Sequence, residues 1–145
     1  MTGCARHRRR RWPKRRNHAG AKPLPRRESS DRFLPLTPSV AKASLNDLAA
    51  VLEGRGWTTL PLFDHSQPLL RVIDARVPHI GESVTLVPAP KVPSAEQVPW
   101  FQSSTGVLFA PCTSPVKAAD AIHFLLAPWV AIALRERRDD RGHRR

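Results

Sequence analysis

Few residues of this chain are of the types that carry out covalent chemistry, and they are irregularly spaced. The candidate nucleophile is Cys112, and His65, His79 and His123 are the bases that a thiolate mechanism would need. None of these residues stands in a local signature of a cysteine enzyme. We therefore expect Cys112 to be a small buried thiol between a strand and a helix.

Metal ligation also finds little support in the spacing. Asp64 precedes His65 directly, and Asp120 lies one helical turn before His123. We expect the second pair to make a local contact on a helix surface. Zinc-finger spacing, a glycine-rich phosphate loop and a serine nucleophile elbow are not found. The sequence thus predicts no catalytic residue, no metal and no cofactor, and a protein that is not an enzyme.

Charge is the most conspicuous feature of the chain. Residues 1–32 hold 12 Lys and Arg against two acidic residues, a balance of +10, whereas residues 33–134 balance at −1 and residues 135–145 at +3. The densest run would neutralise phosphates, with its tryptophan able to stack on an exposed base. Its candidate nucleic-acid-binding residues are Arg8, Arg9, Arg10, Arg11, Trp12, Lys14, Arg15 and Arg16.

Residues 1–38 and 135–145 are expected to be disordered, because they hold too few apolar side chains to offset the entropy of ordering. The Arg, Ala and Pro bias and the single Met indicate a high-GC bacterial genome. An alternative expectation is that translation starts near Val40, in which case residues 1–39 would not be present.

The expected localisation depends on whether the sequence contains a signal peptide or a membrane-spanning segment. No apolar stretch of signal-peptide length follows the basic run. The run Ala121–Leu134 is interrupted by His123 and Pro128 and falls short of the roughly 18 to 20 residues that span a bilayer, so we expect it to belong to the core. We expect a cytoplasmic protein without integral membrane association. The two cysteines form no disulfide framework.

The folded part is expected at residues 40–134. A helix should begin at Ser44 as its cap, with Asp47 in the first turn and Leu45 and Leu48 on its apolar face, and should end near Gly54. β-rich runs follow at 56–63, 69–77, 82–87, 98–102 and 107–110, separated by turn signals that include Gly106.

The last element should be a helix opened by Ser114 and Pro115, which Pro128 kinks or restarts. Short connections favour an antiparallel sheet, so the fold class is α+β, in one domain of order α-β-β-β-β-β-α. We expect Glu82 to be a charged residue at the edge of a strand.

Short sequence motifs within these predicted elements can be compared with known sequences. They are RGW at 55–57, PLLRV at 68–72, GESV at 81–84, PWF with SSTG at 99–106, and APC at 110–112. The pattern resembles a family of small uncharacterised proteins of actinobacterial type, over about residues 44–127. The resemblance implies a helix, an antiparallel sheet and a closing helix, and it implies no activity, cofactor or site residue.

Aromatic residues are the remaining candidates for a functional surface. Trp100 and Phe101 are neighbours on one strand and must point to opposite faces of the sheet. With Trp57 they are candidate protein-binding residues, unless a loop or the C-terminal segment covers the second sheet face. We expect a non-enzymatic accessory protein that binds another protein through the open face or edge of its sheet. The alternative is nonspecific nucleic-acid binding through the Arg-rich tail.

Overall fold

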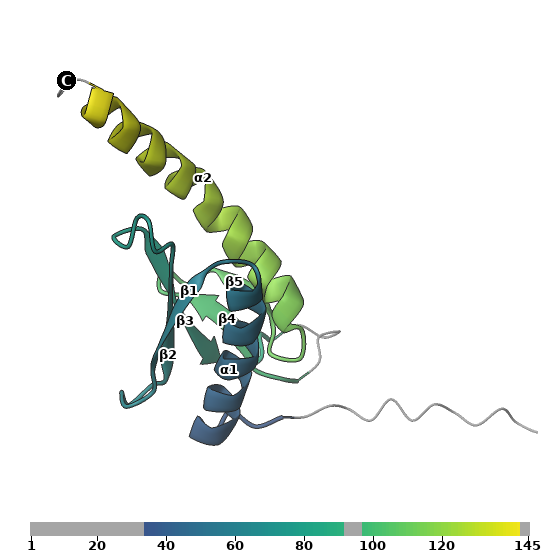
Figure 1. The fold of residues 1–145 in the computed structure, drawn as a ribbon. Coiled ribbons are helices and arrows are strands. Elements are labelled where there is room, and N and C mark those ends of the chain that lie inside the picture. Colours follow the sequence, from purple (N-terminus) through teal and green to yellow (C-terminus); the bar gives the residue numbers. More distant parts are fainter. Residues whose placement is uncertain (1–33, 92–96, 143–145) are drawn as a thin grey trace, which may run out of the picture.

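A five-stranded antiparallel sheet forms the centre of the structure, and strands adjacent in sequence are adjacent in the sheet. The computed structural model describes residues 34–91 and 97–142. The elements are α1 (Pro38–Gly54), β1 (Thr58–Leu62), β2 (Leu69–Ile73), β3 (Gly81–Val87), β4 (Trp100–Ser103), β5 (Leu108–Pro111) and α2 (Pro115–Gly142), as Figure 1 shows. The α+β class and the element order predicted from the sequence are confirmed.

One face of the sheet is buried, and both helices lie against it (Figure 1). Buried side chains alternate along the strands, as at Leu70 and Val72 in β2, Val84 and Leu86 in β3, and Phe101 in β4. The registers Leu70 to Val84 and Leu86 to Phe101 place these side chains side by side across the strands. Leu70 and Val72 of β2 therefore face the core.

The first helix begins at Pro38, earlier than the sequence predicts. The side chain of Thr37 accepts a hydrogen bond from the backbone N–H of Val40 (3.2 Å), so Thr37 and not Ser44 is the N-cap. Pro38 follows at the first helical position, where its missing N–H costs nothing. Ser44 is buried within the helix, and Asp47 is on its exposed side rather than in its first turn.

The folded region also extends further toward the N-terminus than residue 40. The backbone N–H of Leu34 donates to the carbonyl of Gln97 (3.1 Å), and its side chain packs against the core. Residues 34–38 are therefore ordered, contrary to the prediction for 1–38. Residues 1–33, which include the whole Arg run, lie outside the described part of the chain.

The second helix starts at Pro115 as predicted, but Pro128 neither restarts it nor ends it. α2 continues to Gly142, so residues 135–142 are helical and not a disordered tail. Ala133 and Leu134 anchor the helix to the core beyond the proline, and Arg137 donates to the carbonyl of Arg76. Figure 1 shows the last turns of α2 projecting past the sheet.

Candidate functional site

The most exposed large apolar side chains of the described residues lie on α2. One side of this helix is buried against the sheet and α1, through Ala118, Ala119, Ile122, Leu126, Val130 and Ala133. Phe124, on the opposite side, is exposed over 85% of its surface, and Ile132 (48%) and Trp129 (60%) are exposed along the flank between Phe124 and the buried side. Pro128 is exposed between them and Leu125 is half-buried. We refer to Phe124, Leu125, Pro128, Trp129 and Ile132 as the outer surface of α2.

The outer surface of α2 contains no charged residue. Charges return only toward the ends of the helix, at Lys117 and Asp120 on one side and from Arg135 onward on the other. Several large apolar side chains exposed on one element often mark a binding surface, whereas single exposed apolar residues are common and need no explanation.

The same helix is long and apolar enough, by length and composition, to cross a membrane over Pro115–Arg141. This differs from the expectation drawn from Ala121–Leu134 alone, because the helix extends beyond that run on both sides. A core helix passes the same test, and a third of the apolar window is buried inside the fold.

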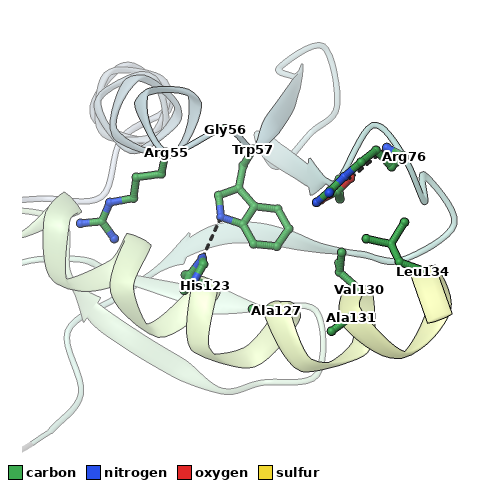
Figure 2. Close-up of a pocket in the computed structure, with 10 residues that line it drawn as sticks. Arg55, Gly56, Trp57, Arg76, His123, Ala127, Val130, Ala131 and Leu134 are labelled. Carbon is green, nitrogen blue, oxygen red and sulfur yellow. Dashed lines mark hydrogen bonds and ion pairs between the residues drawn. The ribbon is translucent and has the colours of Figure 1, made fainter.

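A pocket of about 370 Å³ lies between α2 and the segments that follow α1 and β2. Its wall on α2 is apolar and is formed by Ala127, Val130, Ala131 and Leu134. Figure 2 shows the indole of Trp57 above this wall, with Arg76 at one end and Arg55 pointing away at the other.

Trp57 and His123 form the middle of the pocket. The indole Nε1–H donates to Nδ1 of His123 (3.3 Å), and the two rings meet edge to face with centroids 5.8 Å apart (Figure 2). The acceptor role of Nδ1 leaves the Nε2 atom to carry the proton of the neutral ring. Trp57 itself is buried, so its ring holds the loop after α1 against α2.

Asp120 and His123 do not pair with each other, contrary to the expectation from their spacing. Asp120 accepts from Arg55 (2.5 Å), and His123 accepts from Trp57, so each binds the loop that joins α1 to β1. Among the described residues no three His, Cys, Asp or Glu side chains are grouped as a metal site would require.

Asp74 and Arg76 close the other end of the pocket. The carboxylate of buried Asp74 accepts from the backbone N–H (2.9 Å), Nε (3.0 Å) and the terminal nitrogen (2.7 Å) of Arg76. These hydrogen bonds, above all those from the guanidinium group, lower the pKa of Asp74 below 3.8, against the opposing effect of burial. The same pair raises the pKa of Arg76. Both groups are therefore charged in neutral solution.

The pocket presents charged groups that already satisfy each other. Its acidic residue is held by Arg76, and its Arg55 is held by Asp120, which lies outside the pocket. Its single imidazole is hydrogen-bonded to an indole, which is not a nucleophile. The lining of the pocket thus provides apolar surface for contact with a ligand, and it does not pair a nucleophile with a base that could activate it.

The candidate protein-binding residues predicted from the sequence are not brought together. Phe101 is fully buried in the core and Trp57 is buried in the pocket. Trp100 points to the opposite face of the sheet from Phe101, as predicted, and is half-buried there with its Nε1 atom unpaired. Cys112 is buried after β5, as expected.

Two important features were not recognised in the sequence. Glu82 is not an edge charge but a buried side chain on the core face of β3, whose carboxylate accepts from the N–H groups of Ser83 and Ser104 and the hydroxyl of Ser104.

The outer surface of α2 was missed because the run Ala121–Leu134 was taken as core. The signal was present, since this run is apolar all around the helix, and a helix at the edge of a small domain buries only one side.

No protein-family model matches the chain, and no curated protein and no solved structure is significantly similar to it.

Proposed function

We propose that this protein works without catalysis, by binding another protein chain through the outer surface of α2. The observation that carries the proposal is the exposure of Phe124, Ile132 and Trp129 along one flank of a helix whose other side is packed into the core. A rigid helix presents these side chains at little further entropic cost.

The expected gain on binding is large for so small a surface. Aromatic side chains bury about 150–250 Å² each, and burial of apolar area contributes about 25 cal/mol per Å². Phe124 and Trp129 together would then contribute several kcal/mol, as the central anchors of interfaces do. The helical docking surface is favoured over the open sheet face, because the most exposed aromatics lie on α2 and Trp100 is half-buried.

Site-specific photo-cross-linking tests the proposal. A photoreactive phenylalanine analogue at position 124 should yield a protein adduct in living cells. The same analogue at Leu60, an exposed leucine of β1, tests the open sheet face, and at Lys42, on the exposed side of α1, it reports random collisions. Adducts at 124 above those at 42 support the proposal. Adducts at 60 alone would move the binding surface to the sheet, and equal background at all three would contradict protein binding.

Nucleic-acid binding is the second candidate, and charge segregation supports it. The described residues hold 10 Lys and Arg against nine acidic residues, so nearly all of the net charge of +12 belongs to the remaining parts of the chain. Any nucleic-acid affinity would then reside in residues 1–32 and not in the α+β domain.

A further inference from the structure

Phe124, Pro128 and Ile132 of the outer surface lie on a stripe of α2 whose residue spacing is symmetrical. Along one side of the helix the positions that follow the three-and-four spacing are Lys117, Ala121, Phe124, Pro128, Ile132, Arg135 and Asp139. The steps between them are four, three, four, four, three and four residues. This order reads the same from either end, with Pro128 at its centre.

We propose that the partner of this surface is a second copy of the chain, bound through α2 in antiparallel orientation with a twofold axis at Pro128. This inference rests on the proposed function and names its partner. An antiparallel pair with this axis places Phe124 opposite Ile132 of the second copy, so that each aromatic ring meets an aliphatic side chain.

The charges at the ends of the stripe favour this orientation. Lys117 lies opposite Asp139 of the second copy at each end of the interface, and Arg135 lies opposite the small Ala121. A parallel pair would instead place Lys117 opposite Lys117 and Asp139 opposite Asp139. Like charges facing each other repel, so the sequence of the stripe favours the antiparallel pair.

The flank of the stripe adds to the interface. In an antiparallel helix pair the same flank of both helices meets, so Trp129 of each copy lies near Trp129 of the other, close to the axis. At their observed exposures the four aromatic side chains of two copies supply on the order of 600 Å². Leu125, Pro128 and Ile132 of both copies bring the total close to the roughly 1,000 Å² that a specific interface needs.

A lipid surface fits the same face less well. The stripe carries only two basic side chains, Lys117 and Arg135, against Asp139, which is fewer than the clusters of basic residues that hold a helix on anionic headgroups. Crossing a membrane would further require α2 to leave the core, exposing the cavity that Ile122 and Leu126 fill.

The mass of the full-length chain in solution, measured by light scattering after gel filtration, is the first test. We expect the mass of two chains. Phe124→Glu should reduce the mass to one chain, because it places a charge in the apolar interface, and circular dichroism should be unchanged since Phe124 is exposed in the single chain. Leu60→Glu, which adds the same charge on β1, should remain dimeric. A monomeric parent chain, or dissociation of Leu60→Glu while Phe124→Glu stays dimeric, would overturn the inference.

A charge exchange tests the register. Lys117→Glu should weaken dimerisation, and the double variant Lys117→Glu/Asp139→Lys should restore it, because the pair is rebuilt with reversed sign. Failure of the double variant to recover would overturn the antiparallel register.

Two further results separate this inference from the proposed function. A monomeric parent that floats with vesicles of anionic lipid would replace self-association by membrane binding. A monomeric parent whose position 124 cross-links to a different protein would leave the proposed function standing and remove the second copy as its partner.

Discussion

Glu82 shows how a single buried carboxylate can hold a turn in place. It lies on β3 and accepts from the backbone and hydroxyl of Ser104, in the turn between β4 and β5. We expect Glu82→Ala to lower the free energy of unfolding by about 1–3 kcal/mol, because the N–H of Ser104 would no longer have its partner. Urea unfolding measures the change. Asp47→Ala, on the exposed side of α1, is the control and should stay within about 0.5 kcal/mol of the parent. Equal destabilisation of the two variants would contradict this role.

Asp74 should make stability depend on pH in the acid range. Its pKa is lowered below 3.8 in the folded state by the hydrogen bonds from Arg76, so between the two pKa values the unfolded chain binds more protons. The stabilisation is therefore complete above pH 3.8 and is lost as pH falls through the folded pKa. The difference in unfolding free energy between the parent and Asp74→Asn should narrow as pH is lowered past 3.8.

Urea unfolding of both chains at a series of pH values measures this difference. Asp64→Asn, which removes an exposed carboxylate from the turn after β1, controls for the change in net charge. A constant difference between the parent and Asp74→Asn across the acid range would show that the pair with Arg76 does not lower the pKa of Asp74.

At the scale of elements, the start of α1 depends on one hydroxyl. Thr37 caps the helix by accepting from the N–H of Val40, and its carbonyl accepts from the N–H of Ala41 (2.9 Å). Thr37→Ala should cost about 1 kcal/mol of stability, whereas Thr37→Ser keeps an acceptor and should recover most of that stability. Thermal unfolding of the three chains measures the effect. If Ser does no better than Ala, the hydroxyl is not the cap.

The elements also show what the sequence could and could not predict. The five strands followed from alternation and turn residues, since Gly106 does take the positive φ that its hairpin requires. The start of α1 was missed because Ser44 is also a good cap residue, and only packing distinguishes a cap from a buried serine. α2 runs through Pro128 because packing against the core on both sides of the proline outweighs one missing hydrogen bond.

Site residues were harder to predict than elements, for a reason of geometry. Alternation places Trp100 and Phe101 on opposite faces, but it does not say which face the helices cover. The pairing of Trp57 with His123 joins residues 66 positions apart, which no local pattern reveals. The exposure of Phe124 depends on α2 lying at the edge of the domain, and that placement is a property of the whole fold.

At the scale of the whole molecule, most of the positive charge lies outside the folded domain. The described domain is nearly neutral, so the strong basicity of the chain comes from residues 1–32. Titration of a fluorescent single-stranded oligonucleotide should show binding that weakens linearly in log–log form as salt rises, with a slope of about −0.7 for each phosphate that the chain neutralises. A chain that begins at residue 33 should bind far more weakly, because removal of the +10 balance of residues 1–32 leaves a net charge of only +2 out of +12.

The matched control is a full-length chain in which the arginines of residues 8–11 are replaced by glutamine, which keeps the length but removes four charges. Its salt slope should be shallower than that of the parent, because fewer phosphates are neutralised and fewer counterions are released on binding. Undiminished binding by the chain that begins at residue 33 would place the nucleic-acid site on the α+β domain. Because that truncation keeps Leu34, Thr37 and all of α2, it should still self-associate, so the two activities can be separated in one molecule.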